Sequence, residues 1–201
     1  MNIIPYLIGL TGPTGAGKTT AARMLADMGC AVIDCDALAR EITLPGSPVL
    51  AQLAARFGED ILCKGETLDR ELLARRAFAS EKARQDLNSI THPAITELAL
   101  SRANTLQANA TAFGTKAVVI DAAALLESEL ARHCDHIIVV TAPEELRLAR
   151  ILARDGITEQ AARQRIDAQA HMDYAGHTII DTSEGEAALR EALRKILDDR
   201  L

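Results

Sequence analysis

The chain has 201 residues, 48% hydrophobic residues, 2% aromatic residues, no tryptophan and a formal net charge of −6 at pH 7. This length is enough for one compact domain with a sizeable core, which the composition fills mainly with Ala, Leu, Ile and Val. The acidic balance and the scarcity of aromatic rings exclude a broad, base-stacking nucleic-acid surface, so we expect no nucleic-acid partner.

The N-terminal part reads as strand, helix and strand. Residues 6–11 (YLIGLT) form a short apolar run that ends in a glycine-rich turn, residues 18–29 have helical periodicity, and residues 30–34 (CAVID) are strand-like. Two strands joined by a helix in so few residues indicate a βαβ unit and therefore a parallel sheet. We therefore predict an α/β fold with a parallel sheet and helices on both of its faces.

The middle of the chain has a different composition. Ala, Leu, Arg and Glu dominate residues 37–112, with turn signals at residues 44–48, 63–66 and 91–93 (THP) and with no clear strand. We interpret residues 37–112 as a helical lobe inserted into a single domain that spans residues 1–201.

The α/β alternation then resumes. Strands are predicted at residues 116–121, 135–141 and 177–181, and helices at residues 124–133, 142–155, 157–170 and 183–199. The sequence HCDH (133–136) fits no common zinc-ligand spacing, and we interpret it as a loop that leads into the strand after it.

Residues 12–20 (GPTGAGKTT) contain the phosphate-binding pattern G-x-x-x-x-G-K-T between a predicted strand and a predicted helix, which is the context that this motif requires. The glycines let backbone N–H groups approach phosphate oxygens, and the helix N-terminus adds a favourable dipole. Lys18 is expected to reach the β- and γ-phosphates, and the Thr19 hydroxyl to ligate Mg²⁺. The predicted nucleotide-binding residues are Gly12, Gly15, Ala16, Gly17, Lys18, Thr19 and Thr20.

Several features favour a small-molecule kinase among the proteins with this motif. No NKxD-type guanine-reading segment occurs, and the length leaves no room for a mechanical module. Arg150, Arg154 and Arg165 lie around a polar helix pair, which is typical of a lid that excludes water and stabilises charge on a transferred phosphoryl group. We place this lid at residues 154–172.

Asp34 ends the second predicted strand, and Asp36 follows two residues later. If that strand lies beside the first one, both carboxylates come within reach of the γ-phosphate, because the carboxyl ends of parallel strands face the ligand crevice. Either could accept a proton from an attacking hydroxyl or hold Mg²⁺ through water. Asp36 could instead cap the next helix, and Asp121 also ends a strand, so the Mg²⁺-binding acid stays open.

With these residues in view, the chain resembles the dephospho-CoA kinase family from about residue 7 to residue 170. The segments that carry the resemblance are IGLTGPTGAGKTT, VIDCDALAREI, PGSPVLAQLAARFGEDIL, GETLDRELLARRAF, ITHPAI, VVIDAAALLES, CDHIIVVTAPEELRLARILARDG and RIDAQ. Some positions depart from the family pattern: Pro13 replaces Gly, Ala123 and Ala124 replace a Pro-Leu pair, and His177 and Thr182 lie in an atypical segment.

The resemblance implies transfer of the ATP γ-phosphoryl group, with Mg²⁺, to the ribose 3′-hydroxyl of dephospho-CoA. It puts a candidate general base at Asp36 and a lid arginine at Arg154, with Lys18 as the third catalytic candidate. The helical lobe would contact the substrate, and the candidate substrate-binding residues are Asp34, Arg70, His92 and Asp121. From the residues alone, a histidine before a proline, as His92 is, is more often structural than a ligand contact.

Two other functions stay open at this point: a P-loop kinase for a nucleoside, nucleotide or metabolite, and a nucleotide-dependent binding protein without phosphotransfer. The sequence shows no signal-peptide pattern, no CxxC spacing among its four cysteines and no apolar run of membrane-spanning length. We therefore expect a cytoplasmic monomer or small homo-oligomer with free thiols, without a membrane partner.

Overall fold

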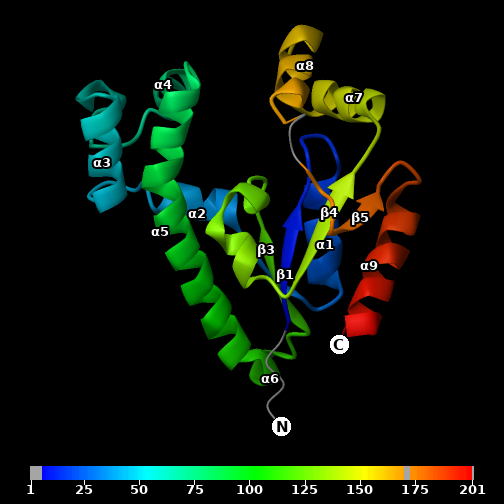
Figure 1. Ribbon diagram of the computed structural model, residues 1–201. Coiled ribbons are helices and arrows are strands. Elements are labelled where there is room, and N and C mark those ends of the chain that lie inside the picture. Colours follow the sequence, from blue (N-terminus) through cyan, green and yellow to red (C-terminus); the bar gives the residue numbers. More distant parts are fainter. Residues whose placement is uncertain (1–5, 170–172, 201) are drawn as a thin grey trace. The chain divides into compact units, whose positions relative to one another are not determined.

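The computed structural model describes residues 6–169 and 173–200 (Figure 1). The described residues up to Ile33 and from Ala103 onward form one compact unit, and Asp34–Arg102 form a second. The predicted limits of the lobe and of the lid stay predictions. Residue 170 of the expected helix 157–170 and residues 170–172 of the expected lid lie outside the described residues.

The first unit is built on a five-stranded sheet in the order β2-β3-β1-β4-β5. The strands are β1 (Tyr6–Thr11), β2 (Ala31–Asp34), β3 (Ala117–Asp121), β4 (His136–Thr141) and β5 (Thr178–Asp181). β1 pairs in parallel with β3 and β4, and β4 pairs in parallel with β5. The predicted α/β class is therefore confirmed.

The condition under which Asp34 and Asp36 would reach the γ-phosphate, that the second strand lies beside the first, is not met. β2 does not lie beside β1, because β3 is inserted between them. The chain therefore reverses its direction of strand addition at β1, whose neighbours on the two sides are β3 and β4. In open parallel sheets, such a switch point creates the crevice in which ligands bind, at the carboxyl ends of the strands.

Helices α1 (Lys18–Asp27) and α9 (Glu186–Arg200) cover one face of the sheet (Figure 1). They pack on alternate residues of the strands. In β1, β3 and β4 the residues between these are buried on the other face as well, so these strands read as continuous apolar runs. The core on this face consists of Ile8, Leu10, Ala117, Val119, Ile138, Val140 and Ile180 from the sheet, with Met24, Leu25, Leu189, Leu193 and Leu197 from the helices.

The other face carries two short 3₁₀ helices, η2 (Leu125–Glu127) and η3 (Glu129–His133), where a single α-helix over residues 124–133 was expected. Leu125 and Leu130 are buried. A Cβ atom on Gly9 would lie 2.5 Å from the Leu125 side chain, so the leucine fits because β1 has a glycine there. The Ser128 hydroxyl donates to the Leu125 carbonyl (2.8 Å), a local bond that competes with helix continuation.

Helices α7 (Glu144–Asp155) and α8 (Glu159–Asp167) form a hairpin beyond the carboxyl ends of β1 and β4 (Figure 1). Gly156 ends α7 in the left-handed conformation, and the Thr158 hydroxyl caps α8 by accepting the Ala161 N–H (3.3 Å). Leu148, Ile151, Ala162 and Ile166 form the small buried core of this hairpin.

The second unit is helical, as predicted for the lobe. It contains α2 (Cys35–Glu41), α3 (Pro48–Phe57), η1 (Glu59–Ile61), α4 (Arg70–Ala77) and most of α5 (Glu81–Ala108), which continues into the first unit and is followed there by α6 (Ala110–Phe113). Leu53, Phe57, Ile61, Leu73 and Ala77 form the centre of its core. Leu62 and Leu68 form an isolated antiparallel bridge beside the turn at residues 63–66.

The turn expected at residues 91–93 is absent, because Pro93 lies inside α5. A proline within a helix removes one hydrogen bond and costs about 3 kcal/mol. A helix of 28 residues that packs through its apolar side chains on the core of the second unit can offset this cost.

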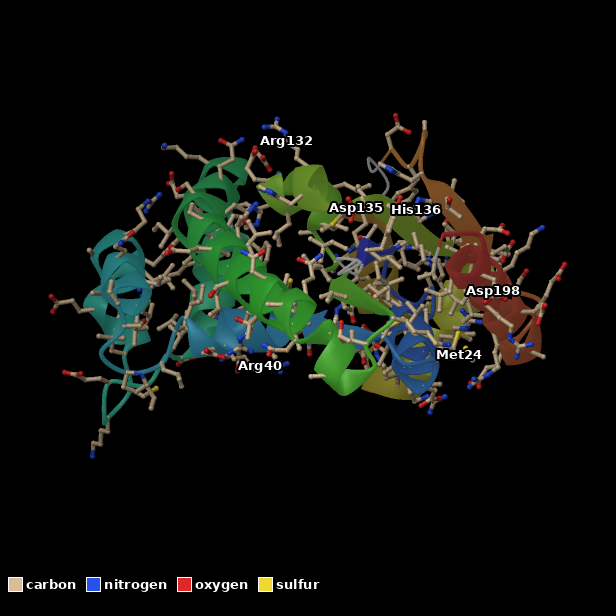
Figure 2. All side chains as sticks on the ribbon, turned by 90° about the horizontal axis from the view of Figure 1, so that it is seen from below. Met24, Arg40, Arg132, Asp135, His136 and Asp198 are labelled. Carbon is tan, nitrogen blue, oxygen red and sulfur yellow. The ribbon has the colours of Figure 1, made fainter. Side chains whose placement is uncertain are left out.

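Asp135 joins the beginning of β4 to β1. Its carboxylate accepts the Leu7 N–H (2.8 Å), and its own N–H donates to the Leu7 carbonyl (2.8 Å). Figure 2 shows Asp135 and His136 next to each other at this end of the sheet. The HCDH segment therefore works as a strand junction, consistent with its interpretation as a loop. Among the described residues, no helix is long and apolar enough to cross a membrane.

The four cysteines are free thiols with different environments. Cys30 and Cys35 are buried and Cys63 is exposed. Burial raises the pKa of Cys30, and burial together with the Asp135 charge raises the pKa of Cys134 to about 12. Both thiols are therefore protonated at pH 8. Because the thiolate is the reactive form, they react slowly with a thiol reagent.

We expect a single rapidly reacting thiol when the native protein is titrated with a chromogenic disulfide reagent at pH 8. Cys63→Ser should abolish the rapid phase, and unfolding in guanidinium should expose all four thiols of the unmodified chain. A rapid phase of two or more thiols in the native protein would contradict this assignment.

Candidate nucleotide-binding site

The loop between β1 and α1 is held in a shape that requires glycine. Gly12, Gly15 and Gly17 have φ angles of 152°, 79° and 95°, in the range that other residues rarely adopt. A Cβ atom on Gly12 would lie 2.2 Å from the Val140 carbonyl oxygen, and one on Gly15 would lie 2.7 Å from the Arg147 carbonyl oxygen. The loop backbone is therefore pressed directly against the β4 and α7 backbones.

The loop ends at the N-terminus of α1 in the way that suits an anion. Gly17 is the N-cap residue, in the left-handed conformation, and has no side chain to bond the first N–H groups of α1. No acidic residue lies in the first turn. These N–H groups and the positive end of the helix dipole are thus left available to an anion, and phosphate binding here stays a prediction.

Lys18 and Asp121 form an ion pair between their ammonium and carboxylate groups. Their side chains are 17% and 10% exposed. Lys18 opens α1 directly after β1, and Asp121 ends β3, the neighbour of β1 in the sheet. The strand order thus brings together two sequence-predicted site residues, and the carboxylate orients the ammonium group at the switch point.

Arg147 and Arg150 of α7 donate to the loop backbone. Arg147 Nε donates to the Thr14 carbonyl (2.9 Å), and Arg150 Nη1 donates to the Gly15 carbonyl (3.2 Å). Arg150 was expected to belong to the lid arginines, whereas its guanidinium contacts the loop.

Thr182 and Gln169 also contact the loop. The Thr182 hydroxyl donates to the Ala16 carbonyl (2.8 Å), and the Gln169 side chain accepts the Thr14 N–H (2.7 Å). Together with Arg147, these residues were missed as loop contacts, because no local pattern marks a side chain that bonds a backbone more than a hundred positions away. The spacing of Arg147 and Arg150 by three residues on one helix face was the only available signal.

Arg154 lies in the last turn of α7 and is exposed. Its guanidinium makes two hydrogen bonds with the Asp155 carboxylate (2.6 and 2.9 Å), which also accepts from Arg165 (2.7 Å). The hydrogen bond from Arg154 holds the pKa of Asp155 below its ordinary value, so this carboxylate stays charged at neutral pH. Asp155 therefore gathers two of the predicted lid arginines on the α7–α8 hairpin.

Asp34 and Asp36 belong to the second unit and stand at the start of α2. The helix cap is Asp34, not Asp36: its carboxylate accepts the N–H groups of Asp36 (2.8 Å) and Ala37 (3.2 Å). Asp36 lies in the first helical turn with an exposed side chain. Asp34 thereby fixes the backbone from which Asp36 projects.

Arg70 and His92 occupy different helices of the second unit. Arg70 begins α4, and its Nη2 donates to the Thr43 hydroxyl (2.9 Å) and to the Arg40 carbonyl (3.4 Å). These bonds tie α4 to the end of α2. His92 lies within α5, next to Pro93. Their predicted contacts with a substrate stay predictions.

The residues present suit Mg²⁺ held mainly by phosphates. Among the described residues, no group of three or more His, Cys, Asp or Glu could hold a metal ion. Thr19 lies in the first turn of α1 with an exposed side chain, beside the Lys18–Asp121 pair. Mg²⁺ in nucleotide sites typically takes one or two protein oxygens together with phosphates and water, which agrees with this donor set.

A parallel sheet with a switch point at β1, a glycine loop against the neighbouring backbone and a lysine at the first helical position define the class of P-loop nucleotide-binding proteins. A family model for dephospho-CoA kinase matches residues 6–181, and the chain belongs to this family.

The chain is similar to curated relatives of that name over most of its length. It is 46% identical over 197 residues to the dephospho-CoA kinase of Corynebacterium efficiens, covering 96% of each chain. It is 46% identical over 168 residues to that of Syntrophotalea carbinolica, covering 83% of this chain and 77% of the relative. The solved structure of TT1252 from Thermus thermophilus is similar with a TM-score of 0.79, at 25% identity over 99% of this chain and 100% of that one.

Gly15→Ala is expected to abolish nucleotide binding, because the added Cβ would collide with the Arg147 backbone and the φ of 79° would be strained. Gly114→Ala is the matched control: its φ of 64° is also positive, but nothing lies within 4 Å of the added Cβ. Titration calorimetry with ATP on both folded variants measures the difference. Equal ATP affinities in the two variants would show that the close approach at Gly15 is unimportant.

Proposed function

We propose that this chain transfers the γ-phosphoryl group of ATP to the ribose 3′-hydroxyl of dephospho-CoA, giving coenzyme A and ADP. The observation that supports this proposal most strongly is the match of residues 6–181 to one kinase family, whose phosphate-binding segment here has an intact glycine loop and lysine. Phosphoryl transfer has a loose transition state, so positioning and charge stabilisation contribute more than covalent chemistry by the protein.

The loop and Lys18 bind the phosphates. Backbone N–H groups at the start of α1 donate to phosphate oxygens, and the Lys18 ammonium, oriented by Asp121, neutralises charge on the β- and γ-phosphates. The Thr19 hydroxyl is proposed as the protein ligand of Mg²⁺, which when bound neutralises negative charge between the phosphates.

Asp36 is the proposed general base. Its carboxylate would accept the proton of the attacking ribose hydroxyl while the oxygen bonds to the γ-phosphorus and the bond to the ADP oxygen breaks. The Asp34 cap fixes the first turn of α2 and hence the direction of the Asp36 side chain. The lid arginine Arg154 is proposed to stabilise charge on the transferred group, and Arg70 and His92 to contact the acceptor.

The reaction is tested by mass spectrometry of acceptors after incubation with ATP and Mg²⁺. We expect one added phosphoryl group on dephospho-CoA and none on nucleosides or nucleoside monophosphates presented in parallel. Lys18→Met should lower turnover by about 10²–10⁴-fold, because a charge-stabilising donor is lost. Phosphorylation of another acceptor alone would reject the proposed substrate but retain the kinase assignment.

Asp36→Asn is expected to lower kcat by about 10²–10⁴-fold with a small change in KM for ATP, because the amide cannot accept the proton. Asp34→Asn should have a much smaller effect, since asparagine caps helices as well as aspartate does. Steady-state kinetics of the two variants compares them, with circular dichroism to check the fold. If the ranking were reversed, the base would be Asp34 instead.

A further inference from the structure

Three consecutive carbonyl groups of the phosphate-binding loop each accept a hydrogen bond from a side chain outside the loop. The Thr14 carbonyl accepts from Arg147 (2.9 Å) and the Gly15 carbonyl from Arg150 (3.2 Å). The Ala16 carbonyl accepts from the Thr182 hydroxyl (2.8 Å). The donors come from α7 and from the segment after β5, and neither segment belongs to the sequence motif of the loop.

These bonds determine where the loop N–H groups point. In a trans peptide, the C=O of one residue and the N–H of the next point in opposite directions. Holding the Thr14 and Ala16 carbonyls outward therefore directs the N–H groups of Gly15 and Gly17 inward. Within the part of the chain that the structure describes, neither of these N–H groups is used in a protein hydrogen bond.

The peptide group between Gly15 and Ala16 is fixed as well. The Ala16 N–H donates to the Pro13 carbonyl (3.1 Å) and closes a turn, while Arg150 holds the same peptide from its carbonyl side. The orientation of the loop is thus set before any phosphate is bound, which lowers the ordering cost that binding would otherwise incur.

Thr182 is the centre of this arrangement. Its side chain is buried, and its hydroxyl donates to Ala16 while accepting from Arg150 Nη1 (2.8 Å). Arg150 Nη2 also donates to the Thr182 carbonyl (3.1 Å). A hydroxyl has one donor and two acceptor sites, so this geometry assigns its proton to the loop carbonyl.

We infer that Thr182, Arg150 and Arg147 are positioning residues that hold the phosphate-binding N–H groups of the loop in place, with Thr182 as the buried centre. This inference rests on nucleotide binding at the loop, as in the proposed function, and is independent of the acceptor that is phosphorylated. These residues lie outside the motif, and they contribute to the affinity for the triphosphate part of ATP rather than for its nucleoside part.

The test compares ATP with inorganic triphosphate, each used to displace a fluorescent ATP analogue in the presence of Mg²⁺. Thr182→Val retains the shape of the side chain but leaves the Ala16 carbonyl without its donor. We expect the Kd of both ligands to rise by the same factor, on the order of 10-fold. Thr182→Ser, which keeps the hydroxyl, should return both Kd values to within about twofold of the unmodified chain.

Thr11→Val is the matched control. Thr11 is also buried, and its hydroxyl donates to the Ala123 carbonyl (3.1 Å), which is not part of the loop. We expect this variant to lose stability without a change in either Kd. If Thr182→Val fails to fold, Arg147→Met is used instead. The Arg147 side chain is half-buried, its loss removes the hydrogen bond to the Thr14 carbonyl, and the binding of both ligands should weaken by the same factor.

Weaker binding of ATP with unchanged binding of triphosphate would identify a nucleoside contact and overturn the inference. Equal weakening in Thr182→Val and Thr11→Val would overturn it too, because the effect would then be general. Neither result depends on dephospho-CoA, so a failure here is distinguishable from a failure of the proposed reaction.

Discussion

The close approach of the phosphate-binding loop to the backbones of β4 and α7 is the constraint on which the rest of the site depends. The loop glycines are usually explained by the phosphate, but here Gly12 and Gly15 are also required by the protein itself, because a Cβ on either would collide with a carbonyl oxygen of Val140 or Arg147. Gly17 differs, since a Cβ there would lie 3.6 Å from Thr182 and only its φ angle favours glycine. Packing and ligand binding therefore select the same residues.

Strand order turns this local packing into a charged site. Because β3 lies between β1 and β2, the carboxylate next to Lys18 comes from Asp121 and not from the acids after β2. Asp34 and Asp36 instead begin the helical unit that follows β2, where one caps the helix and the other is exposed in its first turn. Asp34, Asp36 and Asp121, which all end a predicted strand or follow one, thus have three separate environments.

The sequence predicts the elements well where the signal is local. Apolar runs identified the five strands, and the glycine-lysine motif identified the loop, because both follow from adjacent residues. The order of the strands could not be read from the sequence, because it depends on which strands pair across long separations; the condition that the second strand lies beside the first is not met. A turn was expected at residues 91–93, but the packing of α5 overrides the local preference of Pro93. The contacts of Thr182 and Arg147 with the loop could not be predicted either, because they also join residues that lie far apart in the sequence.

Pro13 shows how a departure from a family pattern becomes understandable in the structure. Among the described residues, the only one with positive φ other than glycine is Glu66, so position 13 needs no left-handed conformation. Proline also restricts the unfolded chain, which favours the folded loop when the native φ is compatible. Its carbonyl still accepts the Ala16 N–H that closes the turn. Three carbonyls of this loop are held from outside, and its second residue, Pro13, is rigid. The loop therefore has little freedom left to lose when a triphosphate binds, and this property comes from side chains and a proline that the motif itself does not specify.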